Sequence, residues 1–90
     1  ISENNRSVLL NDTRMITVLE NGLGVGKTIK DIDIRNISGA TVISIERNKS
    51  MIVSPRGEEI LEEGDHLLVL GNTEQLRKAE LLINGEEENS

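Results

Sequence analysis

The chain lacks cysteine, phenylalanine, tyrosine and tryptophan, and its 90 residues include a single proline and a single histidine. Without cysteine the protein has neither a disulfide framework nor a thiolate metal site. Without aromatic side chains its core must consist of Val, Ile, Leu and Met, each of which buries less area than an aromatic ring. A chain of this length suffices for one domain, and so small a core makes self-association an expected source of further stability.

Positive charge is also scarce. The formal net charge is −6, and the Lys and Arg residues are scattered rather than clustered. Because a nucleic-acid-binding surface needs a basic face, this composition argues against nucleic acid as a partner. No apolar run approaches the length of a membrane span, and no signal-peptide pattern is present. The chain begins at Ile1 without an initiator Met, so we expect it to be an excised piece of a longer protein.

Several short apolar segments bounded by turns predict a small β-sheet. In the segment Met15–Glu20, Ile16 and Val18 share one face, while Met15 lies on the other. The segment His66–Leu70 is apolar on both faces, which predicts a central position in the sheet. Two others are separated only by the polar turn Arg47–Ser50, which predicts a hairpin. The expected strands are Met15–Glu20, Thr41–Glu46, Met51–Ser54 and His66–Leu70, with a brief strand at Glu59–Leu61.

Two segments carry helix signals. Thr28 is a candidate N-cap for a short helix that ends at Asp33. The clearest helix begins after Asn72, which forms a capping-box pattern with Gln75, and it ends at Gly85. Together with the strands, these signals predict an α+β fold: a small β-rich domain with a mostly antiparallel sheet, one short helix and one C-terminal helix.

The chain divides into three parts by composition. We expect residues 1–12 to be an N-terminal flanking segment, residues 13–85 to be the domain, and residues 86–90 to be an acidic, disordered tail. The first part contains the apolar triplet Val8-Leu9-Leu10, and the sequence leaves open whether this triplet joins the domain core or a neighbouring part of the protein.

A glycine-rich stretch, Gly22–Thr28, resembles a phosphate-binding loop. It lies between a predicted strand and a predicted helix, which is the context of the motif G-x-x-x-x-G-K-[ST]. Asn21 occupies the first glycine position of that motif, and no later strand ends in an Asp placed to hold magnesium. The chain is also too short for the parallel sheet of a nucleotide hydrolase. We therefore predict a flexible lead-in to the short helix, with a nucleotide-binding enzyme using Gly26-Lys27-Thr28 as the less favoured alternative.

No set of side chains predicts catalysis or a metal site. His66 has no second ligand at matched spacing, and no acid is placed to orient it toward a nucleophilic serine. Asp33 and Arg35, which follow the short helix and precede the turn at Gly39, are more informative. An Arg in this position can fork to a phosphate or carboxylate while the Asp holds it in place. The same two residues would also form an ordinary surface ion pair.

From Thr28 to Ile83 the chain resembles the C-terminal domain of regulators of potassium conductance, also called the TrkA-C domain. The similarity rests on the order and spacing of several short motifs, and Ser54 stands where the family usually has Asn. The matching residues are Gly39–Ile43, Ile45 with Arg47, Ser54-Pro55, Leu61-x-x-Gly64-Asp65-x-Leu67-x-Val69-x-Gly71 and Glu74-Gln75-Leu76.

This resemblance implies a domain that pairs as a homodimer at the cytoplasmic face of the membrane. Its expected partner is a membrane-embedded potassium or other cation channel or transporter, in the same chain or as a separate subunit. The resemblance implies a regulatory domain and not an enzyme. Its small-molecule ligand would change the geometry of the dimer and so bias the attached transporter.

Some members of the family bind cyclic di-AMP (c-di-AMP) in a cleft between the two protomers. Their pattern has an aliphatic residue where this chain has Lys30, and an Asn where it has Thr41, whose hydroxyl still forms hydrogen bonds but less versatilely than an amide. The resemblance therefore makes c-di-AMP a candidate ligand, with a purely structural dimerisation module as the alternative. The implied ligand-binding residues are Ile29, Lys30, Asp33, Arg35, Thr41, Val42 and Ile43.

Overall fold

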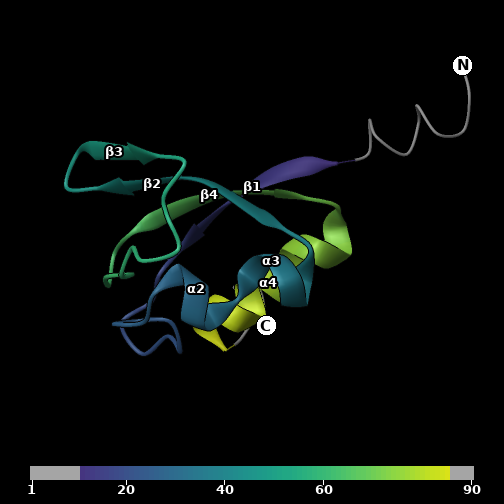
Figure 1. Cartoon of the computed structure of the whole chain (residues 1–90), viewed down its shortest axis with the longest axis horizontal. Helices are drawn as coiled ribbons and strands as arrows, with labels where there is room; N and C mark the ends of the chain where they lie inside the picture. The colour runs from purple at the N-terminus through teal and green to yellow at the C-terminus, as the bar shows by residue number, and fades with distance from the viewer. Residues whose placement is uncertain (1–10, 86–90) are drawn as a thin grey trace, which may run out of the picture.

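The computed structural model of the protein describes residues 11–85. A four-stranded sheet with strand order β1-β4-β2-β3, antiparallel throughout, carries helices on one face (Figure 1). The predicted α+β class is confirmed. The triplet Val8-Leu9-Leu10 and residues 86–90 lie outside the described residues, so the domain boundaries stay a prediction. The elements are β1 (Asp12–Thr17), α2 (Ile29–Ile32), α3 (Ile34–Ser38), β2 (Thr41–Arg47), β3 (Ser50–Val53), β4 (His66–Gly71) and α4 (Thr73–Asn84).

Strand β4 is central, as its apolar sequence predicted. Leu67 and Val69 point to the helix-covered face and are fully buried, and Leu67 is paired with Ile16 in β1 and with Ile45 in β2. The core is therefore aliphatic throughout, as the absence of aromatic residues required. Its buried members are Ile16, Val18, Ile32, Ile34, Ala40, Ile45, Leu61, Leu67, Val69, Leu76, Ala79 and Ile83.

The first strand begins earlier than its sequence predicted. The expected bounds Met15–Glu20 are wrong, since β1 runs from Asp12 to Thr17 and so lies three residues earlier in the chain. After that residue the Leu19 N–H donates to the side-chain oxygen of Asn84 at 3.0 Å, which draws the chain away from β4 and toward the end of α4. The predicted alternation holds, because Ile16 is buried and Met15 is 48% exposed on the opposite face.

The predicted hairpin joins β2 and β3. Asn48 and Lys49 adopt φ values of 51° and 67°, the positive values that a two-residue turn between twisted strands requires. The turn before β4 follows the same logic, because Gly64 has a φ of 87°. In contrast, the strand expected at Glu59–Leu61 is reduced to one isolated bridge between Ile60 and Thr28.

The short helix expected between Thr28 and Asp33 is confirmed as α2. Thr28 caps it as predicted, accepting a hydrogen bond from the Asp31 N–H at 3.1 Å. Asp33 then adopts a left-handed conformation with a φ of 58°, and the chain re-enters a helix as α3, which the sequence did not predict. The described fold therefore has two short helices where one was expected, and both Ile32 and Ile34 remain buried on either side of Asp33.

Helix α4 packs along β1, β4 and α3 and closes the core. Its predicted capping box is confirmed. The Gln75 N–H donates to the Asn72 side-chain oxygen, and the Asn72 N–H donates to the Gln75 side-chain oxygen, each at 2.8 Å. The helix ends at the predicted Gly85. It is the longest helix in the described part of the chain, and no helix there is long and apolar enough to cross a membrane.

Candidate functional site

A groove of about 350 Å³ lies where α2, α3, the start of β2 and the segment after β3 meet. We call it the α3 groove. Four of the seven residues that the family resemblance implied, namely Ile29, Arg35, Thr41 and Val42, line it together. The complete lining is Ile29, Ile34, Arg35, Ala40, Thr41, Val42, Pro55 and Gly57.

The groove exists because β3 is shorter than β2. The two strands pair only from Ser44 onward, and Ser54, with a φ of 52°, turns the chain away from the sheet into Pro55. The last contact between the strands is the hydrogen bond from the Ser54 N–H to the Ile43 carbonyl, at 2.8 Å. The first residues of β2 therefore lack a strand neighbour on this side, and their open edge lines the groove.

Arg35 is the positively charged residue of the groove. It is exposed on α3, and its guanidinium forms no hydrogen bond or ion pair with any residue between 11 and 85. Its five N–H donors are therefore available to a ligand. A guanidinium beside apolar walls suits a phosphate or carboxylate attached to a flat, apolar group.

Asp33 does not hold Arg35, so this prediction is wrong. Its carboxylate accepts a hydrogen bond from the Asn36 side-chain amide at 2.8 Å, within the junction between α2 and α3. The left-handed conformation of Asp33 turns α3 relative to α2, which places Asp33 and Arg35 in different surroundings. Asp33 accordingly does not line the groove.

Lys30 and Ile43 also lie outside the groove lining. The Lys30 N–H donates to the Gly57 carbonyl at 2.9 Å, and a Cβ on Gly57 would lie 3.2 Å from the Lys30 Cβ. The backbone of Lys30 thus holds Gly57, which lines the groove, although Lys30 itself does not line it. Ile43 occupies the irregular position in the pairing of β2 with β4 and reaches β3 through its carbonyl.

Four groove residues were not predicted as site residues: Ile34, Ala40, Pro55 and Gly57. Pro55 and Gly57 lie far along the chain from α3, and only the turn after β3 brings them to it. Pro55 had a signal, since it belongs to the Ser54-Pro55 motif of the family resemblance. Gly57 had none, because its place depends on hydrogen bonds to α2 that no local pattern encodes.

The glycine-rich stretch Gly22–Thr28 is not a phosphate cradle. The Gly24 N–H donates to the Ile83 carbonyl at 2.7 Å, and the Gly26 N–H donates to the Leu61 carbonyl at 2.8 Å. A Cβ on Gly22 would lie 2.4 Å from the Asn84 side-chain oxygen, so glycine is required for this close approach. Since a phosphate-binding loop needs these N–H groups for the anion, the predicted lead-in is in fact a tie between α4 and the rest of the domain.

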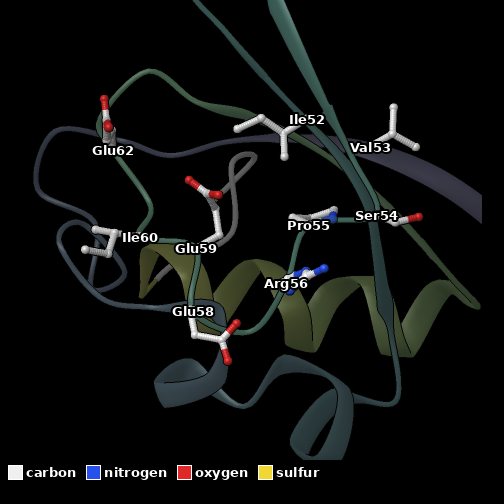
Figure 2. A pocket seen from close by; sticks show the side chains of 9 residues that line it. All are labelled: Ile52, Val53, Ser54, Pro55, Arg56, Glu58, Glu59, Ile60 and Glu62. Atoms are coloured by element: carbon white, nitrogen blue, oxygen red, sulfur yellow. The ribbon is translucent and has the colours of Figure 1, made fainter.

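A second, larger cavity of about 560 Å³, the β3 pocket, lies on the other side of Pro55. Figure 2 shows Ile52, Val53 and Pro55 on its β3 side, with Glu59, Ile60 and Glu62 along the facing segment. Three glutamates line it and only one arginine, which disfavours a phosphate ligand. Its lining residues are Ile52, Val53, Ser54, Pro55, Arg56, Glu58, Glu59, Ile60 and Glu62.

Arg47 joins this facing segment to the sheet. Its guanidinium forms two hydrogen bonds of 2.8 Å with Asp65 and a third, of 3.1 Å, with Glu59. The hydrogen bonds that Arg47 donates to the Asp65 carboxylate are the main cause that raises the pKa of Arg47 above its ordinary value. Burial raises the pKa of Asp65, but the hydrogen bonds from Arg47 and from the Glu62 N–H outweigh it, so the pKa of Asp65 lies below its usual value.

Among residues 11–85 no three His, Asp or Glu side chains are grouped so that they could hold a metal ion. His66, the one histidine, is exposed and its Nδ1 forms a hydrogen bond with the Thr17 hydroxyl at 2.9 Å.

Comparison with known proteins identifies the family of this domain. The model of the TrkA-C domain family matches residues 14–84. The Ktr system potassium uptake protein C of Bacillus subtilis (strain 168) is 32% identical to the chain over 66 residues, which is 73% of this chain and 30% of that protein. The chain thus spans less than a third of the length of this curated relative.

Two solved structures have the same fold and contain a ligand. One is the RCK_C domain dimer of BusR from S. agalactiae in complex with c-di-AMP, with a TM-score of 0.72 at 28% identity, covering 79% of this chain and 93% of that one. The other is the RCK C domain of the potassium transport protein KtrA in complex with c-di-AMP, with a TM-score of 0.72 at 29% identity, covering 87% and 89%. BusR has also been solved with promoter DNA, where this chain covers 36% of the BusR chain.

Proposed function

Since the chain belongs to the TrkA-C domain family, we propose that it is a non-catalytic, ligand-sensing and dimer-forming regulatory domain of a potassium or other cation transport system. Its ligand is c-di-AMP, bound in the α3 groove. The domain works at the cytoplasmic face of the membrane and acts on a channel or transporter, either in the same chain or as a separate subunit.

The observation that carries this proposal is Arg35, whose side chain is exposed in an otherwise apolar groove and has no partner among residues 11–85. A cyclic dinucleotide has two phosphates and two flat bases. Arg35 supplies a forked cation for a phosphate, and Ile29, Val42 and Pro55 supply apolar surface for a base. The c-di-AMP complexes of two structural neighbours support the same ligand class.

Dimer formation follows from the size of the groove. A volume of about 350 Å³ is at the lower end of ligand pockets, and c-di-AMP is built from two identical halves. One protomer therefore offers a half-site, and two protomers related by a two-fold axis complete it. The neighbour described as an RCK_C domain dimer with c-di-AMP supports this arrangement.

The open face of the sheet gives self-association a second reason. The apolar side chains of Met15, Met51, Val53 and Leu70 are between 39% and 70% exposed there. The described helices all pack on the other face. Exposed apolar side chains gathered on one face of a sheet favour a partner that covers them, and in a domain this small a second copy adds stability.

Regulation then requires two geometries of the dimer with different affinities for c-di-AMP. The ligand shifts the population toward the geometry that it binds more tightly, and the attached transporter follows. In this mechanism the α3 groove reads the ligand, and the contact between protomers transmits it. No bond of the ligand is broken.

Isothermal titration calorimetry of c-di-AMP into the wild-type chain and into Arg35→Ala tests the site. Arg35→Ala should weaken binding by about tenfold or more, because a hydrogen bond to a charged group contributes about 1.5–3 kcal/mol. Arg56→Ala is the matched control, since Arg56 is also exposed but lines the β3 pocket instead. Equal affinity in Arg35→Ala and wild type would contradict the proposed site.

Analytical ultracentrifugation tests the dimer separately. We expect a dimer that c-di-AMP stabilises. A dimer that shows no heat with c-di-AMP would instead support a structural dimerisation module. A strictly monomeric chain at high concentration would contradict the shared site.

A further inference from the structure

Arg47 has an unusual number of bonds for a residue that lies outside the α3 groove. From the end of β2 it reaches the segment of residues 55–65, which contains no helix or strand. Its Nε and one Nη bind the two carboxylate oxygens of Asp65, both at 2.8 Å, and the same Nη donates to the Ile60 carbonyl at 2.9 Å. Its other Nη lies 3.1 Å from Glu59 and 3.3 Å from Glu62.

The Arg47–Asp65 pair at the centre of this cluster is largely shielded from water. The side chain of Asp65 is 1% exposed and that of Arg47 is 18% exposed. Asp65 also accepts a hydrogen bond from the Glu62 N–H at 2.9 Å. A bidentate pair with so little solvent is geometrically specific, because neither partner can move without leaving the other charge uncompensated.

Apolar packing alone does not fix the segment that Arg47 holds. Between Pro55 and Glu63, Leu61 is the one fully buried side chain, and Ile60 is 51% exposed. The arginine cluster is therefore the main restraint on one edge of this segment, through Glu59, the Ile60 carbonyl and Asp65.

The other edge of the same segment is bonded to α2. The Ile29 N–H donates to the Glu59 carbonyl at 3.0 Å, the Lys30 N–H donates to the Gly57 carbonyl at 2.9 Å, and the Leu61 N–H donates to the Lys27 carbonyl at 2.9 Å. Residues 57–61 thus lie between the Arg47 cluster and the α3 groove. Ile29 and Gly57, each of which takes part in one of these bonds, both line the groove.

We propose that Arg47 is a positioning residue for the ligand site: with Asp65 it fixes residues 55–61 so that Pro55 and Gly57 face Ile29 and Arg35 across the α3 groove before the ligand arrives. This inference rests on the proposed function of the groove. Its physical basis is preorganisation, since a wall that is already fixed costs less conformational entropy when the ligand binds.

The test compares Arg47→Met with a matched loss of another ion-paired arginine. Arg14→Met serves as the control, because Arg14 lies in β1 and binds Glu80, whose side chain is 6% exposed, at 3.0 Å. A third variant, Arg47→Lys, keeps the charge but loses the bidentate geometry. Each variant is examined as the full chain, well below its own unfolding temperature.

Two measurements are made on each variant: amide hydrogen exchange at Ile29, Lys30 and Leu61, and the calorimetric affinity for c-di-AMP. In Arg47→Met we expect these three amides to exchange about tenfold faster than in Arg14→Met at the same global stability, because the segment opens locally. We expect its affinity for c-di-AMP to fall by about fivefold or more, with Arg47→Lys between the two and Arg14→Met at the wild-type value.

The outcomes separate this inference from the proposed function. Wild-type exchange rates in Arg47→Met, or unchanged affinity despite faster exchange, would overturn the positioning role. If wild type does not bind c-di-AMP, the proposed ligand is wrong, and the exchange rates alone decide whether Arg47 fixes the segment. If Arg47→Met does not fold, the same two measurements on Arg47→Lys decide whether Arg47 positions the segment.

Discussion

The glycine-rich tie at residues 22–28 and the α3 groove are the two regions that sequence made candidates for binding a nucleotide. In the tie, the N–H groups of Gly24 and Gly26 are donated to protein carbonyls. In the groove, the guanidinium of Arg35 has no partner in the described part of the chain. A match to a sequence motif therefore says less about phosphate binding than whether the fold leaves the donors unused.

The largest expected effect separates stability from binding. Asn84 is buried, accepts a hydrogen bond from the Leu19 N–H and donates to the Thr17 carbonyl at 2.8 Å. Asn84→Ala leaves both backbone groups without a partner and should lower the free energy of unfolding by about 2–3 kcal/mol. The affinity of the folded protein for c-di-AMP should not change. Urea denaturation and calorimetry measure the two quantities.

The control for this prediction lies in the glycine-rich tie. Lys27 is exposed, so Lys27→Ala should change the free energy of unfolding by less than about 0.5 kcal/mol. A large loss of c-di-AMP affinity in Lys27→Ala would reverse the comparison, since it would make the tie a binding element after all.

Acid should weaken the groove side of the molecule and not the tie. The pKa of Asp65 lies below its usual value of 3.8, so its carboxylate stabilises the fold above that pH, and this contribution is lost as the pH falls through the lower folded value. The charged groups facing Asp65 are Arg47 and His66, and Glu59 and Glu62 join it through Arg47. The bonds of Asn84 include no titrating group.

Thermal unfolding of wild type and Asp65→Asn between pH 6 and pH 2 measures this contribution. The unfolding temperature of wild type should exceed that of Asp65→Asn at neutral pH, and the two curves should converge at the acid end. Parallel curves over the whole range would show that Asp65 has the same pKa in the folded and unfolded chain.

The smallest expected effect concerns ligand recognition within the groove. Thr41 stands where the family pattern has Asn, and an amide offers both a donor and an acceptor that a hydroxyl provides less well. Thr41→Asn should therefore tighten c-di-AMP binding by roughly three- to tenfold, the range of one added hydrogen bond. Thr13→Asn is the matched control, because Thr13 and Thr41 are both exposed and both pair with Leu70, from opposite sides. Weaker binding in Thr41→Asn would indicate that the hydroxyl itself contacts the ligand.

Sequence reasoning succeeded where one stretch of chain contains the whole interaction. The capping box of Asn72 and Gln75 and the cap at Thr28 each involve residues three positions apart. It was less accurate where a distant group competes. β1 ends early because Leu19 binds Asn84, 65 residues further along the chain.

The candidate site shows the same division. Ile29, Arg35, Thr41 and Val42 came from a pattern within one continuous stretch, and they line the groove together. Asp33 was assigned to the wrong partner, because its left-handed conformation is decided by the burial of Ile32 and Ile34 on either side. Pro55 and Gly57 were missed, because the turn at Ser54 and the bonds to α2 bring them to the site.

By itself, the sequence determined an aliphatic α+β domain, its hairpin and its helix caps, since alternation, capping and turn chemistry act over a few residues. Only the tertiary structure decided that the glycine-rich stretch uses up its donors, that Arg35 keeps its own, and that Arg47 meets Asp65 across 18 positions of sequence. The physical reason is that a hydrogen-bonding group has a limited number of partners, and which partner it takes depends on the segments that packing brings within reach.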